Sequence, residues 1–257
     1  MSEVSPVARF YDQLTPDYHL VYADWEQSME RQGKVLDAMI RAGLGMERAA
    51  VLDCSCGIGT QAIALGRRGH RVTGTDISVA ALARAAREAL GRGVPLALAA
   101  ADMRALPFAD GAFDAVVSAD NSLPHLLTEE DVRAALSQMR RVLRVGGLLV
   151  VSVRDYDAIL RSRPASTPPQ TSALERGRAV TFQLWDWHSD GERYDLEHFQ
   201  LVPDGSDWTV EVRRTSYWAL TRRRLTGFVL EAGFAEPQWR AAARNGFFQP
   251  VLTARAV

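Results

Sequence analysis

The sequence predicts an α/β fold in which a doubly wound parallel sheet is followed by a small antiparallel layer. Two observations support this prediction. Up to about residue 153, short apolar runs alternate with amphipathic helical patterns, and strands that are apolar on both faces are typical of a parallel sheet covered by helices. From residue 179 to residue 220, the pattern changes to alternating segments separated by turn residues, as in antiparallel hairpins.

The first part of the chain is expected to begin with a helix at residues 26–43, whose apolar side chains recur on one face until the glycines at 43 and 45. Ser78 is a suitable N-cap for a later helix. The apolar face of the first helix contains Met29, Val35, Leu36, Met39 and Ile40. Strands are then expected at 49–55, 70–76, 95–102, 111–120 and 148–153, and helices at 60–69, 78–93 and 128–147.

The second part begins after residues 161–170, which are polar and proline-rich. The turn signals Ser189-Asp190-Gly191 and Pro203-Asp204-Gly205 divide residues 179–220, so two or three antiparallel strands are expected there. A last helix at 221–234 and two closing strands around Arg240 and Val251 follow.

The composition excludes several classes of partner. The chain has 257 residues, of which 47% are hydrophobic, and its 30 basic residues are balanced by 31 acidic ones. No polybasic run is present, so nucleic acid is not expected as a partner. The first twenty residues have no signal-peptide pattern, and no run of about 18 apolar residues occurs, so we expect a cytoplasmic protein without membrane contact. The oligomeric state stays open, with a homo-oligomer among the options.

The stretch DCSCGIGT, residues 53–60, contains both cysteines of the chain. Structural zinc sites use about four ligands, commonly in Cys-x2-4-Cys pairs, whereas Cys54 and Cys56 are separated by one residue and have no second cluster. The five histidines are scattered without ligand spacing. We therefore expect no metal or redox site, and we interpret both thiols as small side chains packed where a strand turns into a helix.

The glycines of the same stretch favour a ligand-binding loop. At the carboxyl end of a first strand, Gly57 and Gly59 allow a tight turn and a close approach of the backbone to a ligand. Asp76 ends the second strand about seventeen residues later, where a carboxylate can accept hydrogen bonds from ribose hydroxyls. This pattern is compatible with NAD and with other nucleotide cofactors, and by itself it does not choose between them.

Five stretches of the sequence favour one of these cofactors. In the order and spacing of these stretches, the chain resembles the class I S-adenosylmethionine (SAM) dependent methyltransferases. These stretches are VLDCSCGIGT, VTGTDIS, ADMRALPF, FDAVVSADNSLPHL and LRVGGLLVVSV. More narrowly, DNSLPHL and GGLLVVSVRDYDAIL resemble the glycine N-methyltransferase branch. The resemblance is strong over residues 50–160 and thin in the antiparallel part. It implies a Rossmann-like seven-stranded sheet, with the antiparallel layer inserted after the fifth strand, and SAM as the cofactor, without a metal.

The resemblance also implies a division of the chain. Residues 1–45 are expected to form a helical cap over the active site, and residues 46–157 the SAM-binding core. Residues 158–219 are expected to form the antiparallel excursion on the substrate side. Residues 220–257 would then supply the last helix and the closing strands of the core.

On the cofactor side, the resemblance assigns Asp76 to the ribose hydroxyls and Asp102 to the exocyclic amine of adenine. By the same resemblance, Arg31 either binds the carboxylate of SAM or is a surface arginine of an amphipathic helix. A charge-assisted contact of that kind contributes about 1.5–3 kcal/mol. The full cofactor set is Arg31, Asp53, Ser55, Gly57, Gly59, Asp76, Ile77, Asp102, Met103 and Ala119.

On the acceptor side, the resemblance implies two groups of residues. Those expected near the reacting atoms are Tyr11, Tyr22, Asn121 and His125, and those expected to bind substrate are Tyr18, Asp120, Arg154 and His198. Arg154 matches an arginine that holds the substrate carboxylate in the glycine enzymes, or else it forms a salt bridge with Asp155 or Asp157. Asp120 replaces a glycine of that family, and its carboxylate either attracts a cationic amine, balances the charge of the sulfonium or points to solvent. The tyrosines are either core or site residues.

These motifs predict an enzyme that moves a methyl group from SAM to the amine of a small amino-acid-like acceptor, with S-adenosylhomocysteine as the product. The acceptor would be glycine, sarcosine or an amino-acid-containing antibiotic intermediate. In-line displacement requires positioning and desolvation but no protein nucleophile. The amine must lose a proton, and His125, His198, Asp120 or a tyrosine hydroxyl could accept it. A small-molecule O-methyltransferase is the alternative, and a non-catalytic SAM-binding protein or an NAD-dependent oxidoreductase is a more remote one.

Overall fold

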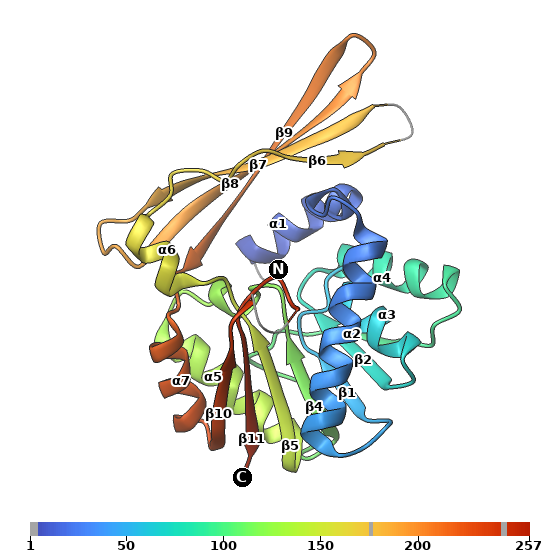
Figure 1. Cartoon of the computed structure of the whole chain (residues 1–257), viewed down its shortest axis with the longest axis vertical. Helices are drawn as coiled ribbons and strands as arrows, with labels where there is room; N and C mark the ends of the chain where they lie inside the picture. The colour runs from blue at the N-terminus through green and yellow to red at the C-terminus, as the bar shows by residue number, and fades with distance from the viewer. Residues whose placement is uncertain (1–4, 175–176, 243–245) are drawn as a thin grey trace.

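The computed structural model describes residues 5–174, 177–242 and 246–257, and it contains two sheets (Figure 1). The larger sheet has the strand order β10-β11-β5-β4-β1-β2-β3, in which β11 is antiparallel to both of its neighbours. This arrangement confirms the predicted seven-stranded Rossmann-like sheet. Its strands are β1 Ala50–Asp53, β2 Arg71–Asp76, β3 Ala97–Ala100, β4 Phe113–Ser118, β5 Leu143–Ser152, β10 Phe234–Arg240 and β11 Val251–Ala256.

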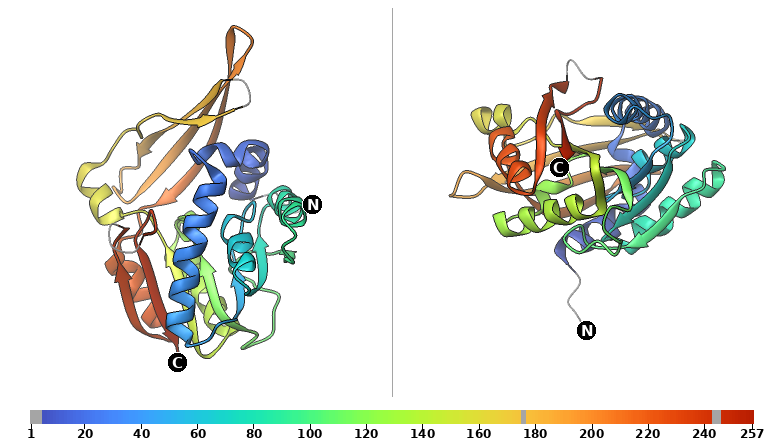
Figure 2. Two further views of the ribbon diagram at one scale, coloured as in Figure 1. Left: turned by 45° about the vertical axis from the view of Figure 1, so that its right-hand side comes forward. Right: turned by 90° about the horizontal axis from the view of Figure 1, so that it is seen from below.

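Helices cover both faces of the larger sheet (Figure 2). Leu52 and Val116 pack into one core cluster with residues of α5 and α7, and Val51 and Val117 pack into another with residues of α2 and α3. Successive strand residues therefore alternate between two buried faces, as the apolar strands predicted. The helices are α2 Trp25–Leu44, α3 Thr60–Arg67, α4 Val79–Gly91, α5 Glu129–Val142 and α7 Arg222–Glu231. Within the described ranges, none of the helices has the length and apolar character that a membrane crossing requires.

The helix predicted at residues 128–147 ends earlier than expected. Thr128 caps α5 by accepting a hydrogen bond from the Asp131 backbone N–H at 3.1 Å, and the helix ends at Val142. The chain then enters β5 directly, where Leu143 pairs with Phe113 of β4. The prediction was wrong over residues 143–147 because strand pairing outweighs the helical periodicity there.

The smaller sheet has four strands, in the order β6-β7-β8-β9, rather than the two or three predicted. The predicted turns connect the three longest strands, and the fourth strand pairs Ser172 with Ala179 at one edge. Sequence analysis missed this strand because it is short, polar and next to the proline-rich segment, which is typical of an edge strand. The elements are α6 Tyr156–Ser162, β6 Gln170–Ala173, β7 Arg178–Trp187, β8 Arg193–Asp204 and β9 Asp207–Trp218.

The N-terminal segment lies between the two sheets (Figures 1 and 2). It consists of α1, Pro6–Leu14, and a 3-10 helix, η1, Thr15–Val21. On the side of the smaller sheet, Arg213 Nε donates to the Gln13 carbonyl at 2.9 Å. On the side of the larger sheet, Ser78 Oγ donates to Asp12 Oδ1 at 2.6 Å. The segment is therefore connected to both sheets, and its tyrosines have a defined position between them.

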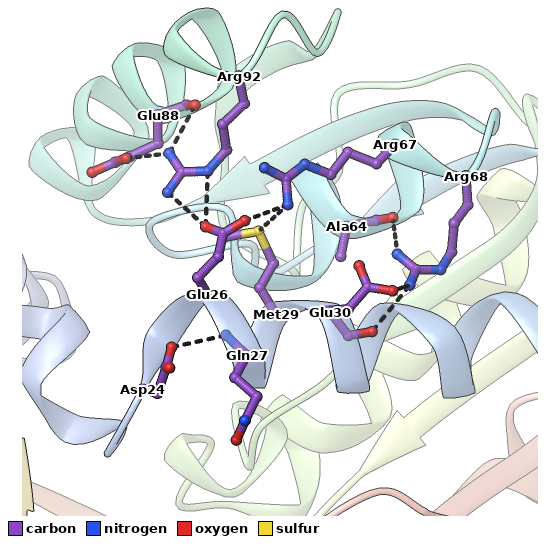
Figure 3. Close-up of polar contacts among 10 residues, drawn as sticks. All are labelled: Asp24, Glu26, Gln27, Met29, Glu30, Ala64, Arg67, Arg68, Glu88 and Arg92. Atoms are coloured by element: carbon purple, nitrogen blue, oxygen red, sulfur yellow. Dashed lines mark hydrogen bonds and ion pairs between the residues drawn. The ribbon is translucent and has the colours of Figure 1, made fainter.

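Ion pairs hold the first turns of α2 against α3 and α4 (Figure 3). Glu26 accepts hydrogen bonds from Arg67 of α3 and from Arg92 at the end of α4. Asp24 caps α2 by accepting from a backbone N–H of the first turn at 2.9 Å. One exposed ion pair contributes only about 0–1 kcal/mol. A network that joins three helices nevertheless restricts the position of α2, the helix that carries Arg31.

Candidate functional site

Two cavities lie where the carboxyl ends of the parallel strands face the N-terminal segment and the smaller sheet. Ligands of open α/β sheets bind at this edge. The first cavity has a volume of about 1030 Å³ and borders the glycine loop and the ends of β2 and β3. The second has a volume of about 880 Å³ and borders the ends of β4 and β5 and the smaller sheet. Tyr11 and Tyr18 line both cavities and therefore mark their junction.

The glycine loop after β1 has a backbone conformation that favours glycine. Gly57 and Gly59 have φ angles of 52° and 92°, in the left-handed region. The Gly57 N–H donates to Asp76 Oδ2 at 2.8 Å, and the Ser78 N–H donates to Asp76 Oδ1 at 2.9 Å. A Cβ atom at Gly57 would lie 3.4 Å from the Tyr18 ring. Asp76 thus supports the loop, and it keeps lone pairs for a ligand in the first cavity, which it lines.

Asp53, at the end of β1, is fully buried and lines neither cavity. Its Oδ1 accepts from the Ser55 N–H at 3.4 Å, and its Oδ2 has no hydrogen-bond partner among the described residues. Burial raises the pKa of Asp53 to about 7, against the opposing effect of the Ser55 N–H. An ionised carboxylate oxygen that is buried without a partner is costly, which agrees with the raised pKa of Asp53.

Most of the predicted cofactor residues meet at the first cavity, which is lined by Ser55, Gly57, Asp76, Ile77, Asp102 and Met103. Like Asp53, Gly59 and Ala119 line neither cavity. The structure therefore supports an indirect role for them, through the shape of the loop and the strand end. Arg31 is exposed on α2 and lines the second cavity, across the junction from the glycine loop. The contacts of all these residues with SAM stay predictions.

Asp102 has a protein partner at the position predicted to meet adenine. Arg104 donates to its two carboxylate oxygens, through Nε at 3.0 Å and through Nη2 at 2.6 Å. Burial acts in the opposite direction, but the hydrogen bonds from Arg104 hold the pKa of Asp102 below its usual value. The carboxylate is therefore ionised, and it can accept from a ligand only through its remaining lone pairs.

Tyr11 and His125 form a hydrogen-bonded pair at the junction of the cavities. The Tyr11 hydroxyl lies 2.8 Å from His125 Nε2, and the His125 ring lies 4.1 Å from the ring of Tyr217. Burial, with a contribution from the charge of Arg154, lowers the pKa of His125 to about 3. Burial raises the pKa of Tyr11 well above its usual value. Both groups are neutral near pH 7, so they can orient a ligand by hydrogen bonding but are weak as bases.

Arg154 follows β5 and lies between two aromatic rings. Its guanidinium carbon is 4.9 Å from the ring centroid of Trp185 and 5.2 Å from that of Tyr217. It donates to the Tyr194 hydroxyl at 2.9 Å and to Gln183 Oε1 at 3.1 Å. A guanidinium has more N–H donors than these two contacts use. Because Arg154 also lines the second cavity, it favours an anionic group of a ligand there.

The contacts around Arg154 bear on two expectations from the sequence, the salt bridge of Arg154 and the role of Asn121. Asp155 and Asp157 pair with Arg222, at 3.0 and 2.8 Å, so the salt bridge considered for Arg154 is not formed with them. Asn121 Oδ1 accepts from the Arg154 backbone N–H at 3.0 Å, and its amide nitrogen donates to a buried tyrosine hydroxyl. Because both ends of this amide are engaged within the protein, the structure favours a positioning role for Asn121 over the predicted contact with the reacting atoms.

His198 and Tyr22 both line the second cavity. His198 is only 4% exposed, and its Nε2 has no hydrogen-bond partner among the described residues. Burial and the charges of Arg213 and Arg154 lower the pKa of His198 to about 4, so its imidazole is neutral near pH 7. The Tyr22 hydroxyl donates to Asp120 Oδ2 at 2.8 Å, and burial raises the pKa of Tyr22 well above its usual value. The structure therefore brings Tyr22 and Asp120 together, as a protonated phenol beside a carboxylate.

Sequence analysis missed many residues of the second cavity, among them Gln183, Tyr217 and Gln249. Gln183 lies opposite His198, and Tyr217 lies opposite Tyr194, on strands whose side chains alternate between two faces. That alternation would have identified Gln183 and Tyr217 if the pairing register of the strands had been known. Gln249 precedes β11 in a stretch without a motif, so no sequence signal points to it.

Replacement of both cysteines tests their interpretation as wall residues. Cys54 and Cys56 are buried and form no disulfide. Across the described ranges, no group of three or more His, Cys, Asp or Glu is arranged to hold a metal ion. We expect the Cys54→Ala, Cys56→Ala variant to bind S-adenosylhomocysteine within about threefold of the unmodified chain, and to lose about 1–2 kcal/mol of unfolding free energy through the small voids left behind. Calorimetric titration and denaturant unfolding measure the two quantities. A collapse of binding together with release of a metal would contradict the interpretation.

Comparisons with known proteins connect this site to methyl transfer. Residues 51–147 match the family model for a methyltransferase domain. A glycine/sarcosine N-methyltransferase from Parasynechococcus marenigrum (strain WH8102) is 37% identical over 143 residues, which are 55% of this chain and 50% of that protein. The chain therefore spans about half the length of this relative.

Solved structures share the fold over nearly the whole chain. The structure of DesVI from Streptomyces venezuelae has a TM-score of 0.76 at 18% identity and covers 99% of this chain and 100% of its own. SAM-bound CalS10, an amino pentose methyltransferase from Micromonospora echinaspora involved in calicheamicin biosynthesis, has a TM-score of 0.72 at 22% identity, with coverages of 90% and 92%. The likeness extends over both sheets.

Proposed function

The chain belongs to the class I SAM-dependent methyltransferases, and from this premise we propose that it transfers a methyl group to the amine of a small amino-acid-like acceptor. One observation carries the proposal: two cavities adjoin at Tyr11 and Tyr18. The first has the glycine loop and the carboxylates of a nucleotide site. The second contains the half-buried guanidinium of Arg154, which suits the carboxylate of an acceptor.

SAM fits the residues around the first cavity. When bound, it supplies an electrophilic methyl group on a sulfonium. Asp76 would accept from the ribose hydroxyls, Asp102 from the adenine amine, and Arg31 would hold the carboxylate of the methionine end. The glycine loop supports this fit, because the Gly57 N–H holds Asp76 at the first cavity with lone pairs left for a ligand, whereas Asp53 lines neither cavity.

The protein's own part in the reaction is to orient the acceptor and exclude water, since the displacement needs no protein nucleophile. Tyr11 and Tyr18 lie at the junction where the two ligands would meet, and burial keeps both phenols protonated by raising their pKa values. Their aromatic faces suit a site that holds a cationic sulfur. Asn121 would position Arg154, and Arg154 would orient the acceptor.

The size of the second cavity supports an acceptor larger than glycine. Its volume of about 880 Å³ is many times that of a glycine molecule, even with space reserved for the end of SAM. Apolar walls from Phe10, Phe182 and Trp185 adjoin the polar groups. This mixture suits an amino acid with an extended substituent, or an amino-acid-containing antibiotic intermediate, better than glycine or sarcosine.

An acceptor panel tests the proposed function. The protein is incubated with SAM and with glycine, sarcosine, larger amino acids and amino sugars, each beside its hydroxyl analogue, and methyl gain is followed by mass spectrometry. We expect transfer to amines, faster for the larger acceptors, and thermal stabilisation by S-adenosylhomocysteine but not by NAD. Methylation of the hydroxyl analogues alone would support an O-methyltransferase instead. Binding without any transfer would support a non-catalytic SAM-binding protein.

A further inference from the structure

Asp120 follows β4 in a backbone conformation that few residues adopt. Its φ angle is 57°, and that of the next residue, Asn121, is 65°. A left-handed conformation is costly for residues other than glycine, although aspartate and asparagine tolerate it best. The turn presents the Asp120 side chain to the second cavity. Strained backbone of this kind is found preferentially at functional sites.

A closed ring of hydrogen bonds holds Asp120 in this position. The Asp120 N–H donates to Ser152 Oγ at 2.8 Å, and Ser152 Oγ donates to Gln249 Oε1 at 3.0 Å. The Gln249 amide then donates to Asp120 Oδ1 at 3.2 Å and closes the ring, while Tyr22 donates to Oδ2 at 2.8 Å. Each carboxylate oxygen therefore accepts from one neutral donor and keeps a further lone pair.

The charges around Asp120 leave room for a cation. Among the described residues, none of the cationic side chains lies within ion-pair distance of its carboxylate. The titratable groups that face it are the phenols of Tyr11, Tyr18, Tyr22 and Tyr217 and the guanidinium of Arg154. Burial raises the pKa of Asp120, although the Tyr22 hydrogen bond and the Arg154 charge oppose that rise. A ligand cation would compensate a carboxylate that has no ion-pair partner among the residues that the structure describes.

We propose that Asp120 recognises the acceptor as an ammonium ion and accepts its proton, which makes the second cavity selective for basic amines. This inference rests on the proposed function and names its acceptor class. An N–H bond of the ammonium breaks and an O–H bond forms on Asp120, so the amine regains its lone pair. That lone pair forms the N–C bond as the S–C bond of SAM breaks. The product carries the new methyl group on an ammonium, and the proton on Asp120 passes to water after release.

The other candidate bases are less suited to this step. The imidazoles of His125 and His198 have pKa values of about 3 and about 4, so they bind protons weakly. The buried phenols have raised pKa values and already carry their protons near pH 7. The carboxylate of Asp120 supplies both the charge and the proton-accepting group.

A binding experiment tests the recognition of ammonium without requiring turnover. Cyclohexylamine, a cation near pH 7, and the neutral cyclohexanol are titrated into the protein saturated with S-adenosylhomocysteine. We expect the unmodified chain to prefer the amine by at least about tenfold. Asp120→Asn and Asp120→Gly, which both suit a left-handed backbone, should abolish that preference. The preference should persist in the control Asp204→Asn, at the exposed turn of the β8–β9 hairpin. No preference in the unmodified chain, or its survival in both variants, would overturn the proposal.

A pH profile tests the proton transfer, with the amine that the acceptor panel shows to be methylated fastest. The unmodified enzyme should lose kcat as the pH falls through the raised pKa of Asp120, because a protonated carboxyl cannot accept a proton. Asp120→Asn should lower kcat by about 100-fold near pH 7 and recover as the pH rises and the free amine becomes abundant. An equal loss at every pH would show a purely positioning role and overturn proton acceptance. Ammonium preference without transfer to any panel amine would reject the proposed function but retain the recognition by Asp120.

Discussion

Replacing Arg154 with methionine is expected to lower kcat/KM for a carboxylate-bearing acceptor by about 1000-fold, mainly through a higher KM. Two charge-assisted hydrogen bonds at about 2 kcal/mol each account for this effect. Methionine fills much of the space between Trp185 and Tyr217 but offers neither charge nor donors. Initial rates across acceptor concentrations, at saturating SAM, give the two constants separately. An unchanged acceptor KM would reject the carboxylate contact.

Two further variants separate the charge of Arg154 from its geometry. Arg154→Lys keeps the charge but loses the planar arrangement of donors, so it should fall between the unmodified enzyme and the methionine variant. Arg222→Met is a control, because Arg222 also lies near the start of α6, where it pairs with Asp155 and Asp157, but lines neither cavity. It should leave kcat/KM within about threefold. Binding of S-adenosylhomocysteine checks that each variant is folded.

The fold could be predicted where local pattern and tertiary packing agree. The two-faced apolar strands β1, β4 and β5 required helices on both sides, and Ser78 accepts from the Ala81 N–H as the predicted N-cap. The end of α5 was missed because pairing of Leu143 with Phe113, which is distant in the sequence, determines it. The edge strand β6 was missed although it pairs with the next strand, β7. Helical periodicity cannot report that pairing, and a short polar segment such as Gln170–Ala173 does not distinguish a strand from a loop.

The same distinction between local pattern and tertiary packing applies to the candidate site. Spacing could predict that residues of neighbouring strand ends, such as Gly57 and Asp76, lie close together, and a hydrogen bond joins these two in the structure. The hydrogen bonds that hold Asp120 could not be predicted from the sequence. Their partners Tyr22, Ser152 and Gln249 lie far apart in the sequence and are brought together only by the fold. The same limit applies to Asn121, whose amide is used within the protein, a fact that its position after β4 does not reveal.

Asp76→Asn is expected to weaken the binding of S-adenosylhomocysteine by about 1000-fold. An amide is uncharged and has a single oxygen, so its NH2 group would face a backbone N–H of either Gly57 or Ser78. The variant would thus lose the proposed charge-assisted hydrogen bonds to the ribose, at about 1.5–3 kcal/mol each, and would disturb the glycine loop. Calorimetric titration measures the affinity, and Asp37→Asn, which changes an ion-paired aspartate outside both cavities, is the control.

The pH dependence of this affinity distinguishes a ribose contact from a purely structural role. Burial raises the pKa of Asp76, against hydrogen bonds from Ser78 and Gly57. Its ionised form is therefore lost at a higher pH than that of an ordinary aspartate, and the affinity should fall as the pH decreases through this raised pKa. Asp76→Asn cannot titrate, so that acidic loss should disappear while affinity stays low throughout. The fold should tolerate the change near pH 7, because removing a buried charge offsets part of the lost hydrogen bonding. An Asn variant that binds as tightly as the unmodified chain would show that Asp76 only shapes the glycine loop.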